Sequence, residues 1–361
     1  MGFSDWDGND QPAQERDHDW NAEAGNFDTI PVIDVGGIRS PVFEERQKVA
    51  VEIKNACTRV GFFYIENHGI PEDLIQGVFG FAEKFFKLPF EQKMEVCLDN
   101  SPNFKGYTPI GGSGKPGPDG KGNLNEAFEW GLDPNLDGDP DNKWIDPHMK
   151  GPNRWPREPA GLEDHLSAYY RELRGFCRLL ARVVALSLGL SEDHFDSIIT
   201  HPGCSVVMAH YPPQKQGAEA RGLDAHTDSE FFTILAPGPI RALEVANKAG
   251  QWISAPPKPG TFIVNVGDQL QALTNDYYIS TRHRVMNYTG QERYAVPFFL
   301  LPNYETVIKP IPQLITGGHV AKYSPISAGK MYKDNMTALH RIASTIPEFA
   351  KYRTNPVSDQ S

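Results

Sequence analysis

The most informative stretch of this sequence is Leu223-Asp224-Ala225-His226-Thr227-Asp228, which comes shortly before a β-rich run at residues 231–235. On extended backbone, side chains at positions i and i+2 point to the same side. His226 and Asp228 can therefore bind one cation together. The same H-x-D pattern at His194 and Asp196 lies in a helical turn, where side chains two apart diverge. We interpret that second pair as surface residues.

A third ligand of matching chemistry is His283, near the start of a β-rich run at residues 282–288. Two imidazoles and one carboxylate on a β-scaffold match the facial triad that binds non-haem Fe(II). This triad leaves further coordination positions of the metal open for other ligands. Zinc bound by the same ligands remains an alternative. Arg293 follows on the next β-rich run, where its guanidinium can hold the remote carboxylate of a chelating co-substrate through a bidentate pair.

The fold class follows from short β-rich runs, separated by Gly and Pro, that fill the chain after residue 203. These runs lie at residues 204–211, 231–236, 242–245, 261–266, 282–288 and 293–301. Many short strands without helices between them favour a sandwich or jelly-roll barrel over a doubly wound parallel sheet. Before residue 203, the fold is expected to begin at residues 30–35, with a strand at 61–65 and a helix at 71–95. A second helix carries a buried stripe of Leu173, Phe176, Cys177, Leu180 and Val184.

Composition excludes several classes of partner. The chain has 361 residues with 35 Lys and Arg against 46 Asp and Glu, a net charge of −11. Without a basic surplus, nucleic acid and anionic membranes are poor partners. The longest apolar stretch is interrupted by Arg178 and Arg182, and the acidic start lacks a secretory signal. The 4 cysteines form no C-x-x-C pair. We expect a cytoplasmic protein with a small-molecule substrate and no obligate protein partner.

The sequence resembles the 2-oxoglutarate/Fe(II)-dependent oxygenases, in the branch of isopenicillin N synthase and the plant and fungal biosynthetic dioxygenases. The resemblance covers about residues 28–345. Its motifs are Ile30-Pro31-Val32-Ile33-Asp34, residues 61–70, Gly106-Tyr107, His210-Tyr211-Pro212-Pro213, and the set His226, Asp228, His283 and Arg293. It implies a double-stranded β-helix, or jelly-roll, core in a mainly β fold with flanking helices.

The resemblance also implies roles for single residues. His226, Asp228 and His283 would bind Fe(II), and Tyr211 would reach the 2-oxoglutarate carboxylate beside Arg293. Phe299 would line the substrate pocket, with Tyr107 and Phe128 as weaker candidates. With 2-oxoglutarate and O2 as co-substrates, the enzyme would hydroxylate, desaturate or cyclise a small organic molecule, in specialised metabolism. The triad does not distinguish these outcomes.

Two departures from the family pattern bear on the co-substrate. The usual R-x-S is Arg293-Tyr294-Ala295 here, and residue 209 is Ala where many plant members have Asn. The missing serine hydroxyl removes one donor to the carboxylate. Two alternatives therefore stay open: an Fe(II) oxidase that uses no 2-oxoglutarate, and a jelly-roll binding protein without turnover.

The expected domain organisation is simple. Residues 1–28 form a disordered acidic tail, and residues 29–361 form a single oxygenase domain. Within it we expect an N-terminal α/β region at 29–200, the jelly-roll core at 203–305 and a C-terminal segment at 306–361.

Overall fold

The computed structural model describes residues 25–114, 122–133, 151–214, 222–315, 320–340, 346, 349 and 351–352. Most of the tail expected at residues 1–28 lies outside the described residues, as does part of the expected C-terminal segment.

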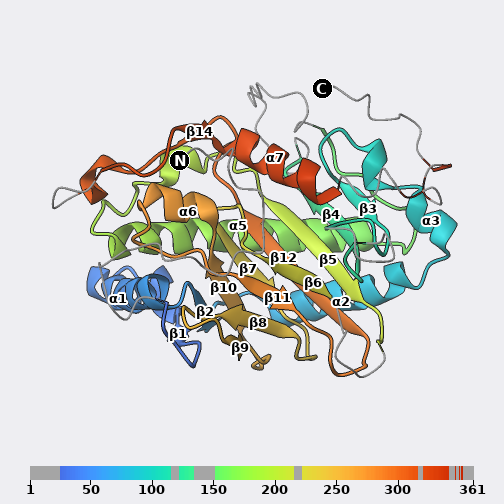
Figure 1. Ribbon diagram of the computed structural model, residues 1–361, viewed down its shortest axis with the longest axis horizontal. Coiled ribbons are helices and arrows are strands. Elements are labelled where there is room, and N and C mark those ends of the chain that lie inside the picture. The colour runs from blue at the N-terminus through green and yellow to red at the C-terminus, as the bar shows by residue number, and fades with distance from the viewer. Residues whose placement is uncertain are drawn as a thin grey trace.

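Two large sheets form the centre of the molecule (Figure 1). The larger contains, in spatial order, β1 (Val32–Asp34), β2 (Phe62–Glu66), β10 (Phe262–Val266), β7 (Phe232–Ala236), β12 (Arg293–Leu300), β5 (Ser205–Tyr211), β4 (Glu126–Gly131) and β3 (Gly106–Thr108). The smaller contains β6 (Leu223–His226), β11 (His283–Val285), β8 (Leu243–Ala246) and β9 (Trp252–Ser254). A short pair, β13 (Val307–Ile308) and β14 (Ile326–Ser327), stands apart. Neighbouring strands run antiparallel except β1 and β2.

This arrangement confirms the expected jelly-roll core. Each of the β-rich runs expected after residue 203 contains a strand. Strands β3 and β4 were not among the runs predicted from the sequence. In β4, Glu126 and Glu129 interrupt the apolar pattern, yet both are buried, because each has polar partners inside the protein.

The helices are α1 (Phe43–Arg59), α2 (Glu72–Phe86), α3 (Phe90–Met94), α5 (Leu162–Ser187), α6 (Asp268–Leu273) and α7 (Ala328–His340). The expected stripe on α5 is fully buried, and α5 runs across the strands of the larger sheet (Figure 1). The single helix expected at residues 71–95 is two helices. Pro89 separates them, because proline lacks the N–H that a continuous helix needs and restricts Leu88 before it.

Strand register divides the larger sheet into two faces. Direct partners in an antiparallel pair share a face, as do positions i and i+2. Arg293 and Phe299 of β12 therefore share a face with their partners Tyr211 and Ser205 of β5. This inner face meets the smaller sheet through a cluster of Ala209, Tyr211, Ala242, Val285 and Ala295. On the outer face, Phe298 of β12 packs against Tyr170 of α5.

No helix among the described residues is both long enough and apolar enough to cross a bilayer. The cysteines Cys57, Cys97, Cys177 and Cys204 are buried free thiols.

Candidate active site

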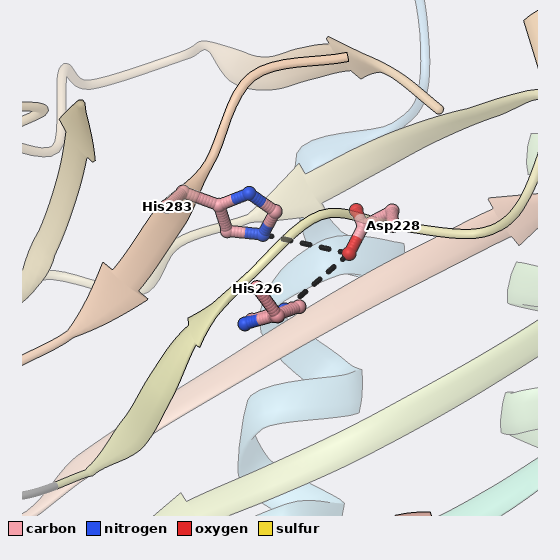
Figure 2. Close-up of side chains that lie close together, drawn as sticks. All are labelled: His226, Asp228 and His283. Atoms are coloured by element: carbon pink, nitrogen blue, oxygen red, sulfur yellow. Dashed lines mark ion pairs between the residues drawn. The ribbon is translucent and has the colours of Figure 1, made fainter. Parts of the chain in front are cut away.

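Three side chains from two distant parts of the chain converge between the two sheets. His226 ends β6, Asp228 follows it in the next loop, and His283 begins β11. The Nε2 atoms of His226 and His283 each lie 3.4 Å from Oδ1 of Asp228 (Figure 2). One ligand atom from each residue lies within 4.8 Å of the others. This spacing fits one metal ion, and it is the only such cluster of His, Cys, Asp and Glu among the described residues.

Strand pairing brings the two histidines together. His226 and His283 are direct partners in the antiparallel pair of β6 and β11, and their ring centroids are 4.3 Å apart. Since Asp228 lies two positions after His226, its carboxylate reaches the same side of the chain. The geometry expected from the H-x-D pattern is therefore present.

Backbone carbonyls fix the orientation of both imidazoles. Nδ1 of His226 lies 2.7 Å from the carbonyl oxygen of Asp224, and Nδ1 of His283 lies 3.1 Å from that of Thr281. A carbonyl only accepts, so each Nδ1 carries the proton and donates. Each Nε2 then keeps its lone pair for a metal, which is the usual support for a histidine ligand.

Asp228 is held by two donors that the sequence analysis missed. Its Oδ2 accepts hydrogen bonds from Thr233 Oγ1 at 2.5 Å and from Asn265 Nδ2 at 2.8 Å. Oδ1 is left to face the imidazoles. The available signal was Asn265 itself, a polar residue within the apolar strand Phe262–Val266.

The charge of Asp228 is well defined. Burial alone would raise the pKa of this carboxyl, but before a metal ion binds, the facing imidazoles of His283 and His226, where protonated, outweigh burial and hold the pKa well below its usual range. Asp228 is therefore an ionised carboxylate at neutral pH. Together with two neutral nitrogens it supplies one negative charge, which suits a divalent cation with three further positions open.

Arg293 and Tyr211 form a second polar site on the inner face. They are direct partners across β12 and β5, and the guanidinium carbon lies 4.7 Å from the centre of the Tyr211 ring. Arg293 is 1% exposed, and its Nε donates to the carbonyl oxygen of Ile240 at 3.3 Å. Its Nη1 is buried without a hydrogen-bond partner among the described residues. Burial lowers the pKa of Arg293, so the site favours an anion that would pair with the guanidinium.

Comparisons with known proteins agree with this geometry. Residues 202–302 match the model of the 2OG-Fe(II) oxygenase superfamily, and residues 30–158 match that of the non-haem dioxygenase in morphine synthesis N-terminal domain. The homoarginine-6-hydroxylase 2-ODD-233 of Oryza sativa subsp. japonica is 33% identical over 326 residues, which cover 84% of this chain and 95% of the relative. The chain belongs to the 2OG-Fe(II) oxygenase superfamily.

Further relatives of this oxygenase include a fungal enzyme and a solved structure. The 2-oxoglutarate-Fe(II) type oxidoreductase ppzC of Metarhizium majus is 35% identical over 297 residues, 75% of this chain and 76% of the relative. The crystal structure of JOX2 in complex with 2OG, Fe and JA matches with a TM-score of 0.72 at 27% identity, over 88% of this chain and 88% of that one. The oxygenase thus uses Fe(II) and 2-oxoglutarate, and the triad His226, Asp228 and His283 is its metal site.

The aromatic residues expected in the substrate pocket of this oxygenase lie on two different faces. Phe299 is on the inner face, opposite Thr233, which holds Asp228. Tyr107 and Phe128 are partners across β3 and β4 on the outer face, where both rings pack against Phe85 of α2. Tyr107 and Phe128 therefore face away from the metal site.

The second H-x-D pair does not contribute to the metal site. Asp196 forms an ion pair with Arg182 of α5 at 2.7 Å, and the His194 ring packs edge-on against Phe195. This placement agrees with the interpretation of His194 and Asp196 as residues outside the site.

Proposed function

We propose that this oxygenase holds 2-oxoglutarate between the triad and Arg293 and hydroxylates a small organic molecule beside Phe299. The observation that carries the proposal is the unpartnered Nη1 of Arg293, a buried cationic donor on the face that also carries the Asp228 anchor Thr233. A carboxylate that accepts from Nη1 would complete the site. The hydroxyl of Tyr211 would lie beside it.

Each residue has a defined task in this proposal. His226, Asp228 and His283 would occupy one side of the metal ion and leave the other side to co-substrates. Bound Fe(II) would supply the oxidising chemistry that consumes O2 and converts 2-oxoglutarate to succinate and CO2. Arg293 would fix the far end of 2-oxoglutarate, and the apolar inner cluster around Ala295 would exclude water.

The direct link between the two sites runs along β11. His283 and Val285 are two positions apart and so share a side of the strand. Val285 belongs to the inner cluster with Tyr211 and Ala295. A molecule bound to the metal beside His283 would therefore extend past Val285 to reach Arg293. This path supports a chelating co-substrate of several carbons.

Hydroxylation is the outcome we favour among those that the triad permits. Relatives are named homoarginine-6-hydroxylases, and the JOX2 structure holds JA beside 2OG and Fe. These names support a small-molecule substrate. A role in specialised metabolism is consistent with the fungal relatives, and the free thiols support a reducing, cytoplasmic setting.

We also propose that residues 29–361 act as one domain. The largest apolar cluster contains Ile33 of β1, Phe298 of β12 and Phe349 near the C-terminus. Strand β2 pairs with β10, so the N-terminal region completes the sheet of the catalytic core.

A spectroscopic titration tests the proposed function. The anaerobic protein receives Fe(II) and then 2-oxoglutarate, and we expect a metal-to-ligand charge-transfer band that saturates with co-substrate. Succinate release on admission of O2 follows the reaction. A protein that binds Fe(II) but gives no band at saturating 2-oxoglutarate would contradict the proposal and favour the oxidase alternative.

A further inference from the structure

Glu129 of β4 is a buried carboxylate on the inner face, and neither the metal triad nor the Arg293 site uses it. Glu129 lies opposite Val207 of β5, and Val207 packs against the inner cluster that contains Tyr211 and Ala295. The Glu129 side chain is 8% exposed. A buried charge in this position needs an explanation beyond packing, because burying an ionised group is costly.

A row of direct cross-strand partners connects Glu129 with the metal site. Asn265 is opposite Thr233, Thr233 is opposite Phe299, and Phe299 is opposite Ser205. One end of this row holds Asp228, and at the other end the hydroxyl of Ser205 donates to Glu129. Neighbouring strands are about 4.8 Å apart, so Thr233 and Ser205 are separated by roughly 10 Å. A small molecule covers that distance.

All the hydrogen bonds that Glu129 accepts with its side chain fall on one oxygen. Oε1 accepts from Tyr332 of α7 at 2.8 Å, from Ser205, and from the ammonium of Lys105 at 3.4 Å. Oε2 accepts no hydrogen bond from the described residues. One acceptor of a buried carboxylate is therefore available to a ligand.

The surroundings of Glu129 suit a ligand with an apolar body. Phe299 and Leu339 pack, partly buried, against an apolar cluster that includes Tyr332 and Met336. His340, the last residue of α7, has a buried Nδ1 without a hydrogen-bond partner among the described residues. Burial lowers the pKa of His340, and the negative charge of Glu129 acts in the opposite direction.

We propose that Glu129 orients the substrate by accepting, at Oε2, a hydrogen bond from an N–H or O–H group of the substrate. This inference rests on the proposed function and names the substrate class: a small molecule with an N–H or O–H donor that lies about two strand spacings, roughly 10 Å, from Thr233, which holds Asp228. Lys105 balances the charge of Glu129, so a neutral donor such as an amide, hydroxyl or ring N–H is sufficient. A substrate carboxylate at this end would be repelled.

Matched probe pairs test this inference on the full-length protein with Fe(II) and 2-oxoglutarate under anaerobic conditions. The pairs are thymine with 1,3-dimethylthymine, and benzyl alcohol with benzyl methyl ether, in which methylation removes the donor. Dissociation constants come from calorimetry and from the shift of the charge-transfer band. We expect the donor of each pair to bind at least about tenfold more tightly to the wild type. Glu129→Gln, which places an N–H donor at one of the two oxygens, should abolish this preference.

Controls separate the inference from folding and from the proposed function. Glu126→Gln changes a glutamate on the opposite face of the same strand and should leave the donor preference unchanged. If Glu129→Gln does not fold, Glu129→Asp is the second variant. It keeps the charge but is one methylene shorter, so its oxygens lie farther from the ligand and the preference for the donor should fall. Equal binding within both pairs in the wild type, or a preference that survives Glu129→Gln, would overturn the inference alone. Absence of the charge-transfer band would overturn the proposed function and this inference with it.

Discussion

Thr233 and Asn265 are direct cross-strand partners, and both donate to the same oxygen of Asp228. The two donors come from β7 and β10, neighbouring inner strands of the larger sheet, whereas Asp228 lies in a loop. The rigid sheet thereby fixes a loop carboxylate with Oδ1 directed to the metal position. Such support around a metal ligand commonly governs affinity as strongly as the ligand's own placement.

The first prediction concerns this pair of donors. Thr233→Val and Asn265→Leu should each weaken divalent metal binding by about 10- to 100-fold, because Asp228 loses its orientation. Calorimetric titration with Mn(II) measures the effect without turnover. Thr227→Val is the matched control, since the Thr227 hydroxyl donates to Asp268 rather than to Asp228. Unchanged Mn(II) affinity in both variants would show that the loop orients Asp228 without the sheet.

The second prediction concerns the metal ligands. His226→Ala, Asp228→Ala and His283→Ala should each abolish succinate formation and metal binding while the protein stays folded, because each removes a ligand that no neighbour replaces. Circular dichroism and metal content measure the two properties separately. His194→Ala should behave as the wild type. Loss of iron in His194→Ala together with retention of iron in His226→Ala would show that the other H-x-D pair binds the metal.

The third prediction concerns Glu126, on the outer face of β4. Its carboxylate accepts from Lys93 Nζ at 2.6 Å and from Tyr107, and faces His210 Nδ1 at 2.7 Å. Burial alone would raise the pKa of Glu126, but the hydrogen bonds from His210, Lys93 and Tyr107 outweigh it and lower the pKa. A carboxyl whose folded pKa is depressed stabilises the protein above its unfolded value, and this stabilisation is lost as pH falls through the folded value.

Urea unfolding at a series of pH values tests Glu126. The wild type should lose stability as pH falls below about 4.5, the ordinary glutamate pKa. Glu126→Gln should be less stable at neutral pH, and its stability should depend less on pH in the acid range. The loss at neutral pH should reach about 3 kcal/mol, because Lys93 is left buried without its counter-charge. Parallel pH profiles for the two proteins would contradict the assignment.

Local pattern was enough to predict two of the three metal ligands, and residue type on a later β-rich run indicated the third, His283. The i, i+2 spacing of His226 and Asp228 is a property of a few neighbouring residues, and the structure brings the two side chains together, although β6 ends at His226 and Asp228 lies in the following loop. The strands after residue 203 were likewise predicted, because their β-branched and aromatic runs are bounded by Gly and Pro.

The pairing of strands that are distant along the chain could not be predicted from local sequence patterns. The support of Asp228 by Asn265 depends on the pairing of β7 with β10, which no local pattern encodes. The faces of Tyr107, Phe128 and Glu129 depend on the register of β4, and a shift by one residue would exchange its two faces. With β4 itself unidentified, the inner position of Glu129 could not be predicted.

The fourth prediction concerns Arg293. Arg293→Leu should raise the 2-oxoglutarate concentration at half-saturation by about 10- to 100-fold with little change in Mn(II) affinity, because the buried carboxylate loses its charged partner. Arg293→Lys keeps the charge but not the planar fork and should be intermediate. Arg284→Leu is the control, since Arg284 pairs with Glu244 at 2.8 Å on the other side of β11. Wild-type co-substrate binding in Arg293→Leu would overturn the role of this arginine.

The last prediction concerns Ala295, which occupies the serine position of the R-x-S pattern that the family resemblance implies. Ala295 is 2% exposed and shares the inner face with Arg293, which lies two positions earlier on β12. A serine at this position would direct its hydroxyl to the side that holds the guanidinium, where it can donate to the same carboxylate. A neutral hydrogen bond contributes about 1 kcal/mol, so Ala295→Ser should tighten 2-oxoglutarate binding by about fivefold in the anaerobic titration.

A matched substitution shows whether the effect is specific. Ala236 of β7 is also 2% exposed but lies opposite Val296, on the outer face. Ala236→Ser should leave 2-oxoglutarate binding unchanged and lower the melting temperature, because its hydroxyl has no carboxylate to meet. Equal or weaker co-substrate binding in Ala295→Ser would mean that Arg293 and Tyr211 already satisfy the carboxylate. In that case the absence of the serine costs this oxygenase nothing in co-substrate affinity.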